Sequence, residues 1–184
     1  MLAQTDGMRR NVAHYKDSQA TMRLYDDALA RGQWGLLWAF LTGRSRGLLS
    51  LQGALQSATV QAVIAAKACM VPIAQIDGSE NRIADFDRNF NPLHDHTRDR
   101  WLSIARAWQR GRYLPPVKLV QVGDHYFVRD GHHRISVARA LGWDVVEATV
   151  EVWIVGKSLS KSLQFSLVHI DYPHAGLGGL TASV

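Results

Sequence analysis

Apolar positions in the first part of the chain recur at helical intervals. They are Val12, Tyr15, Met22, Tyr25 and Leu29. This spacing predicts an amphipathic helix, which Gly32 is expected to end. The apolar run at 34–41 and the alanine-rich run Ser50–Met70 predict two further helices. Residues 1–70 are therefore expected to form a helical N-terminal segment.

The pattern changes at Pro72. The run of residues 71–76 is short and β-branched, which predicts a strand, and a polar loop rich in turn formers follows it. Trp101, Ile104, Ala105 and Trp108 then fall at i, i+3, i+4 and i+7. This stripe predicts an amphipathic helix that ends at Gly111.

A β-hairpin is predicted next, because strand-forming runs at 117–122 and 125–129 flank a Gly-Asp turn. Its second strand leads into Asp130, the expected N-cap of a helix that ends at Gly142. A last strand is predicted over 145–155. The chain is therefore expected to be an α+β protein with three parts: 1–70, 71–155, and a partly mobile C-terminal extension over 156–184.

Composition narrows the function classes. The net charge of +5 is compatible with phosphate-bearing partners, although 20% charged residues is less than a polybasic protein has. Cys69 is the only cysteine, so no internal disulfide forms, and its apolar neighbours predict a buried thiol. No stretch has the character of a signal peptide or a membrane span. We therefore expect a cytoplasmic protein with no membrane partner.

The row Asp130–Arg134, Asp-Gly-His-His-Arg, holds the candidate chemistry. A strand that passes through Asp-Gly into a helix leaves unpaired N–H groups at the positive end of the helix dipole, which favours an anion. Gly131 lets a phosphate approach the backbone, and Arg134 offers a fork of donors. His132 and His133 add donors that exchange protons near neutral pH.

Two other interpretations of the row stand beside this one. Asp-Gly before a helix is also a common turn and cap, with Arg134 solvated. A metal site built from the four histidines His94, His96, His132 and His133 is disfavoured, because adjacent helix residues point apart and no cysteine or well-spaced carboxylate accompanies them. We expect no metal held by protein ligands alone.

The order of elements from 71 to 155 resembles the N-terminal domain of ParB proteins and the sulfiredoxin fold. The specific part is the hairpin followed by Asp-Gly-His-His-Arg. The N-terminal stretch around "LLWAFLTGRSRGLLSL" also resembles the leader of uncharacterised bacterial ParB-like proteins. The resemblance implies a small mixed sheet with helices, preceded by the helical segment, and a nucleotide at the row.

The row can be compared with each branch of this superfamily. ParB has a Gly-Glu-Arg-Arg box that contacts the triphosphate of CTP, and here Gly131 and Arg134 are kept while the acid is replaced. Sulfiredoxin has a reactive cysteine where this chain has His132, so sulfiredoxin activity is not expected. His133 and Arg134 match the histidine and arginine that hold ATP phosphates in that family.

ParB-like free-serine kinases have a similar Asp-Gly-His-x-Arg row and use a glutamate from the loop after the first strand. Glu80 falls in the corresponding region, and Arg82 matches an arginine that ParB domains often have there. The resemblance implies a catalytic role for Glu80 with His132 and His133, and phosphate contacts for Arg82. A solvated loop acid is the alternative for Glu80.

Three further side-chain roles complete the expected site. Asp85 and Asp87 are candidates for contacts to Mg²⁺ through water, or else turn residues. Thr97 and Arg98 open the helix of Trp101, and this second N-terminus is expected to face the same phosphates.

Two functions remain open at this point. The first is a nucleotide-binding domain for ATP, ADP or CTP with Mg²⁺, which hydrolyses the nucleotide or transfers phosphate to a small hydroxyl compound. The second is a non-enzymatic partition or regulatory module in which nucleotide controls binding to DNA or a protein. The aromatic run with Trp34, Trp38 and Phe40 adds a third expectation, a packing arm against the core domain or in a homodimer.

Overall fold

The computed structural model describes residues 2–56 and 58–156, with side chains from Ser18 on. The helices and strands are α1 (Leu2–Thr42), β1 (Leu49–Ser50), α2 (Leu51–Ala54), β2 (Val60–Pro72), β3 (Ile76–Ser79), α3 (Arg98–Gln109), β4 (Val117–Val122), β5 (His125–Asp130), α4 (His132–Ala140) and β6 (Val145–Val155). Two short 3-10 helices, η1 (Ile73–Gln75) and η2 (Asp95–Thr97), complete the set. This is an α+β fold, as the sequence predicts.

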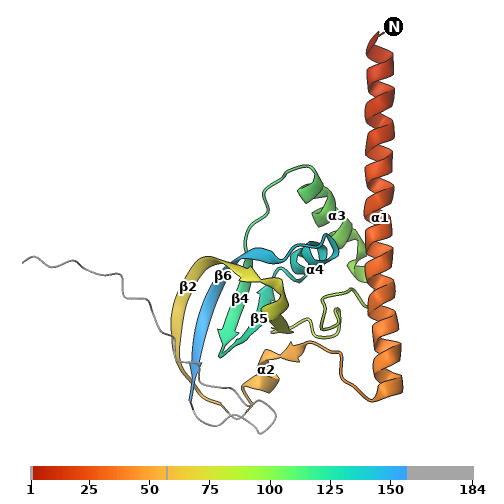
Figure 1. Cartoon of the computed structure of the whole chain (residues 1–184). Helices are drawn as coiled ribbons and strands as arrows, with labels where there is room; N and C mark the ends of the chain where they lie inside the picture. Colours follow the sequence, from red (N-terminus) through yellow and green to blue (C-terminus); the bar gives the residue numbers. More distant parts are fainter. Residues whose placement is uncertain (1, 57, 157–184) are drawn as a thin grey trace, which may run out of the picture.

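The strands form one mixed sheet in the order β1-β3-β5-β4-β6-β2. β1 pairs with β3, β3 with β5, and β4 with β6 in parallel, whereas β4–β5 and β2–β6 are antiparallel. Helices α4 and α3 lie between the sheet and α1 (Figure 1). The start of α4 directly follows β5 at the centre of the sheet, so the row 130–134 has strands on both sides.

Apolar side chains fill both faces of the central strands. Alternation along β5 sends Val128 toward α4, where it joins a cluster with Ile135, and sends Phe127 to the other face, where it packs with the residues of α2. The Phe127 ring lies directly over Gly78, where a Cβ atom would be 2.2 Å from the ring. β5 is thus fixed from both sides, which holds the start of α4 in place.

Helix α1 is attached to the body through one buried face. Tyr25 is fully buried, its ring meets Trp101 edge-on at 5.5 Å, and its hydroxyl lies 3.1 Å from Thr97 Oγ1. The predicted end of this helix at Gly32 is wrong. Gly32 lies within α1 against the Pro92 carbonyl, where a Cβ would be only 2.4 Å from the oxygen, so this glycine permits close packing.

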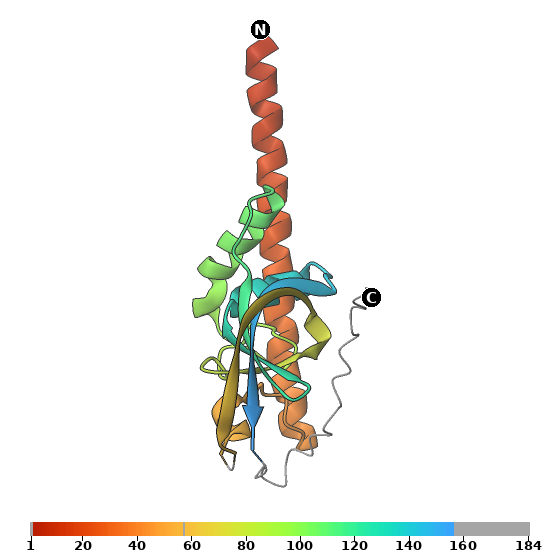
Figure 2. The ribbon, with the colours of Figure 1, turned by 90° about the vertical axis from the view of Figure 1, so that its left-hand side faces the viewer.

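The predicted helix over Ser50–Met70 is also wrong. Only Leu51–Ala54 are helical, and Val60–Pro72 form the edge strand β2 beside β6 (Figure 2). Almost all of β2 is exposed, because no other described element covers either of its faces. Cys69 lies on this strand and is exposed, so the expected buried thiol is wrong as well.

The remaining elements match the sequence pattern more closely. The helix of Trp101, the hairpin over 117–130 and the strand Val145–Val155 are confirmed. The single strand expected over 71–76 is instead the end of β2, the turn η1 and the start of β3. The expected mobile extension, 156–184, lies beyond the described residues except for Gly156. Within the described ranges, no helix has both the length and the apolar character needed to span a membrane.

Candidate functional site

The start of α4 is shaped by Gly131, which has φ +105°. A Cβ atom at this position would be 2.6 Å from the Val117 side chain, so only glycine fits. Asp130 does not cap the helix as expected. The N-cap residue is Gly131, with no side-chain cap, and the Asp130 carboxylate instead accepts a hydrogen bond from Arg134 Nη2 at 2.6 Å. The first amide N–H groups of α4 are therefore left without a side-chain acceptor.

The Arg134 guanidinium is bound by the protein itself. Its Nη1 donates to the carbonyls of Pro115 and Pro116, and its Nη2 to Asp130. The side chain is mostly buried. In this arrangement Arg134 ties α4 to the segment that enters β4.

His132 is 4% exposed and has a defined partner. Its Nε2 lies 2.8 Å from Ser79 Oγ at the end of β3. The amide N–H groups of Asn81 and Arg82 both donate to that same oxygen, at 3.3 and 2.9 Å. Because these two bonds use the lone pairs of Ser79, its own proton is left to be donated to Nε2, which places the imidazole proton of His132 on Nδ1.

His133 is half-buried on the next position of the helix. Its ring meets the edge of Phe86 at 5.3 Å, while the ring of His132 stacks on the same phenylalanine at 6.1 Å. The Nδ1 atom of His133 is buried and has no hydrogen-bond partner within the described residues. A buried polar atom without a partner costs free energy, which a bound ligand could offset.

Both histidines are held neutral. Burial, and after it the positive charge of Arg82, lowers the pKa of His132 from 6.5 to about 4. The same two causes, with a further contribution from Arg100, lower the pKa of His133 to about 4. At His133 the charges of Arg82 and Arg100 outweigh that of Asp85, which would favour an anion at this position.

Two acidic side chains, Asp85 and Asp130, lie near His132 and act against the lowering of its pKa. Asp85 Oδ2 accepts from Arg82 Nη1 at 2.9 Å, and Asp85 Oδ1 lies 3.3 Å from His96 Nε2. Asp87 behaves differently. It is buried, and its carboxylate accepts from the amide N–H groups of Asn89 and Asn91. Asp85 is thus available to the site, whereas Asp87 shapes a turn.

Glu80 does not lie with the row. Its carboxylate accepts from Arg129 Nε at 2.9 Å, and Arg129 also binds Glu151 at 2.7 Å on the face of the sheet opposite α4. Glu80 follows the end of β3, so its side chain points away from the face that Ser79 uses. Ser79 is therefore the residue from this segment that reaches the row.

Thr97 and Arg98 also lie elsewhere. Thr97 Oγ1 donates to the His94 carbonyl at 2.8 Å, and Arg98 forms an ion pair with Asp26 at 3.3 Å. Both residues therefore attach α3 to α1. The structure brings together His132, His133, Arg82 and Asp85 from the predicted set. It adds Ser79, Phe86 and Arg100, which sequence reasoning missed. Alternation along β3 was a usable signal for Ser79.

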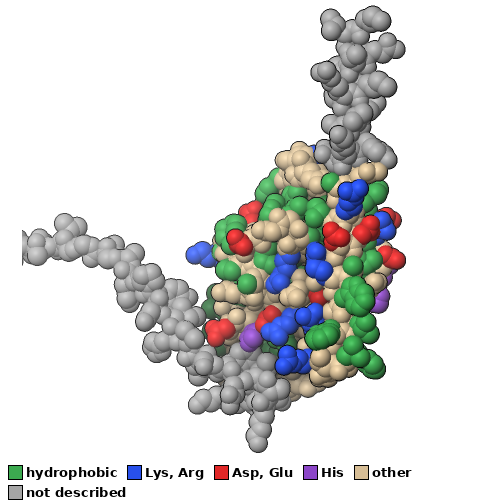
Figure 3. Space-filling model, turned by 45° about the vertical axis from the view of Figure 1, so that its right-hand side comes forward, with side chains coloured by type: hydrophobic (Ala, Val, Ile, Leu, Met, Phe, Trp, Pro, Cys, Tyr) green, Lys and Arg blue, Asp and Glu red, His purple; other side chains and the backbone are tan. Residues whose placement is uncertain are grey.

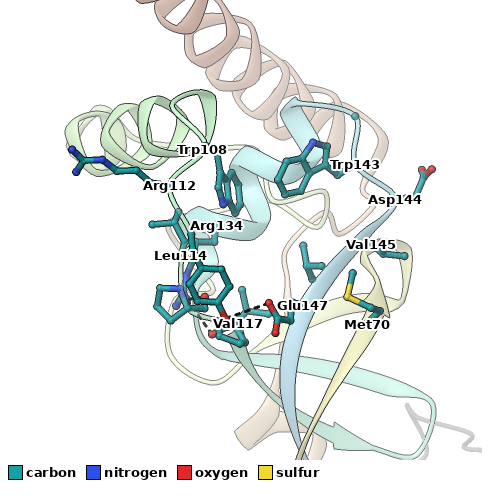
Figure 4. A pocket seen from close by; sticks show the side chains of 16 residues that line it. Met70, Trp108, Arg112, Leu114, Val117, Arg134, Trp143, Asp144, Val145 and Glu147 are labelled. Carbon is teal, nitrogen blue, oxygen red and sulfur yellow. Dashed lines mark hydrogen bonds between the residues drawn. The ribbon is translucent and has the colours of Figure 1, made fainter.

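A separate cavity of about 760 Å³ lies between the end of α3, the end of α4 and β6 (Figure 4). The rings of Trp108 and Trp143 form one wall, 4.6 Å apart. Tyr113 donates to Glu147 at 3.4 Å on the opposite side. Arg134 is the one residue of the row among the lining residues, so this cavity is distinct from the start of α4.

The chain was compared with family models, curated proteins and solved structures. No family model matches the chain, and no curated protein matches it. Among solved structures, a sulfiredoxin from Arabidopsis thaliana is similar with probability 1.00, a TM-score of 0.34 and 15% identity, over 46% of this chain and 83% of that chain.

Proposed function

We propose that the start of α4 binds the phosphate groups of a nucleotide, ATP, ADP or CTP, together with Mg²⁺. The observation that carries the proposal is the uncapped start of α4 beside Arg82 and Arg100. Free amide N–H groups at a helix start and guanidinium groups nearby are the two features that phosphate recognition uses most.

Each side chain has a defined part in this proposal. The amide N–H groups of His132, His133 and Arg134 point at one phosphate, and Gly131 allows the chain to turn from β5 into α4 against Val117. Arg82 neutralises phosphate charge after exchanging its bond to Asp85 for one to the ligand. His132 positions the backbone through Ser79, and His133 becomes a donor once a phosphate is close. Arg134 supports the site indirectly by holding α4 to β4.

Hydrolysis or transfer of the phosphate to a small hydroxyl compound would need a carboxylate near the row. Glu80 is paired with Arg129 on the other face of the sheet, so it would have to leave that partner and cross to the α4 side. Asp85 is close enough to act on the pKa of both histidines. If the site catalyses phosphate chemistry, we propose Asp85 in place of Glu80 as the residue that positions a hydroxyl or Mg²⁺.

Titration calorimetry of the full chain with ATP, ADP and CTP in the presence of Mg²⁺ tests the proposal. We expect saturable binding of at least one nucleotide, and Arg82→Ala should weaken it about tenfold or more, since a charge-assisted bond to phosphate is lost. Arg112→Ala is the matched control, because this exposed arginine lies on the loop after α3, away from the site.

A second readout follows from the histidines. A phosphate beside His133 stabilises the charged imidazole, so NMR titration should show its pKa rising from about 4 when nucleotide binds. No heat with any of the three nucleotides, or equal affinity of the Arg82→Ala variant and the wild type, would show that the proposal is wrong.

A further inference from the structure

The C-terminal end of α1 exposes an unusual amount of apolar surface. Trp34 is 69% exposed, Trp38 62% and Phe40 85%. Three leucines on the same turns, Leu36, Leu37 and Leu41, are also exposed. We call these six residues the α1 end patch. Contiguous exposed apolar surface of this kind marks a contact with another molecule.

The α1 end patch covers most of the helix circumference. The buried positions of α1 among the described side chains face the body; they are Thr21, Tyr25, Ala28, Gly32 and Gly35. Trp34, Leu37, Trp38 and Leu41 recur at i, i+3, i+4 and i+7 on another side of the helix, and Leu36 and Phe40 widen this stripe. In the space-filling view, apolar side chains follow the margin of the molecule along α1, with Lys and Arg side chains beside them (Figure 3).

The charge next to the patch is mainly positive. No Asp or Glu occurs in the sequence from Ala28 to Ile76, whereas Arg31, Arg44 and Arg46 fall in that stretch. Arg88 joins them in space, because its amide N–H donates to the Arg46 carbonyl at 2.7 Å. All four arginines are exposed. An apolar patch is therefore bordered by several positive charges.

A groove connects the two kinds of surface. It has a volume of about 690 Å³ and runs between α1 and the loops that follow it. Trp34 and Trp38 line it together with Arg31 and Arg46, and Asp27 lines it as the one acidic side chain. Aromatic walls with guanidinium groups between them suit a phosphate headgroup whose acyl chains continue toward the apolar patch.

We propose that the α1 end patch docks the protein on an anionic lipid surface as a peripheral contact. Tryptophan, phenylalanine and leucine enter the boundary between headgroups and acyl chains, and the arginines meet the lipid phosphates. This differs from the expectation of no membrane partner, which rested on the lack of a spanning segment. A peripheral contact needs no spanning segment, and it does not depend on the function proposed for α4.

The charges favour a lipid surface over a second copy of the chain. Self-association through the patch would bring two surfaces with the same four arginines against each other, and Asp27 is the one acidic side chain that lines the groove between them. An anionic membrane supplies the opposite charge and an apolar interior at once.

Co-sedimentation of the full chain with vesicles tests this proposal. The vesicles are made of phosphatidylcholine alone or with 30% phosphatidylglycerol. We expect binding to the anionic vesicles, weakened in high salt, and a blue shift of tryptophan emission from Trp34 and Trp38. Arg44→Ala with Arg46→Ala should lower the partition coefficient about thirtyfold, at about fivefold per arginine.

The apolar part is tested by Trp38→Ala with Phe40→Ala, which should lower binding at least about tenfold because the inserted area is lost. Tyr113→Ser, an equally exposed aromatic on another face, is the matched control and should bind as the wild type does. Circular dichroism verifies that each variant is folded. The proposal is overturned if the anionic vesicles bind no protein, if the Trp38/Phe40 variant binds unchanged, or if light scattering shows a dimer that the variant abolishes without any vesicle binding.

Discussion

The start of α4 and the end of α1 both depart from the usual rule that polar side chains are exposed and apolar side chains are buried, each in the opposite way. At the start of α4, imidazoles and a serine hydroxyl are buried; at the end of α1, indoles and a phenyl ring are in water. The buried polar groups are positioned by specific bonds, such as Ser79 to His132. The rings of Trp34, Trp38 and Phe40 are mostly exposed, and within the described part of the chain no such bond holds them. Removing support from the first region should therefore alter the fold, and removing side chains from the second should alter only what it contacts.

The largest expected effect on stability comes from Gly131. Gly131→Ala combines an unfavourable φ with a Cβ that meets Val117, so the free energy of unfolding should fall by about 3 kcal/mol. Gly142→Ala is the control, since Gly142 has φ +75° but nothing within 4 Å of a Cβ, and it should cost about 1 kcal/mol. Urea unfolding measures both. Equal costs would mean that the space beside Val117 does not restrict residue 131.

A smaller decrease in the free energy of unfolding is expected at acidic pH. The unfolded chain takes up a proton on His132 near its ordinary pKa of 6.5, and the folded chain only near 4, so stability falls as the pH drops from 6.5 toward 4. Between pH 7 and pH 4.5 this amounts to about 2 kcal/mol for His132. Urea unfolding at both pH values should show a correspondingly smaller loss for His132→Gln. An identical pH dependence in the two proteins would contradict a lowered pKa of His132.

The smallest effect on stability is expected at the α1 end patch. Phe40 is 85% exposed, so Phe40→Ser should change the free energy of unfolding by less than about 0.5 kcal/mol. Urea unfolding beside Gly131→Ala makes the comparison direct. A loss above 1 kcal/mol would show that Phe40 packs within the protein and that the contrast between the two regions fails.

Local patterns predicted much of the fold. The stripe of Trp101, the Gly-Asp turn and the strand 145–155 each contain their own signal, so their elements are confirmed. The run Val60–Pro72 has no such signal. Its alanines and lysine favour a helix in isolation, but pairing with β6 makes it a strand, and that partner lies far away in the sequence.

The candidate site was predictable in part for the same reason. The row 130–134 was found because strand, glycine and helix follow one another in the chain. The partners of this row come from other elements. Ser79, and not Glu80, contacts the row because of the face of β3 that turns toward α4. Arg100 comes close because of the way α3 packs. The role of Arg134 depended on the carbonyls of Pro115 and Pro116, which no motif includes.

The pairing of β2 with β6 also sets the order of events during synthesis. Pro72 pairs with Val145, so β2 has been made for more than seventy residues before its partner exists. At ordinary translation rates that is a delay of roughly four to fifteen seconds. During this time an apolar strand leaves the ribosome unpaired, with only Lys67 as a charge against aggregation. The newly made chain therefore passes through an interval in which chaperone binding would protect it most.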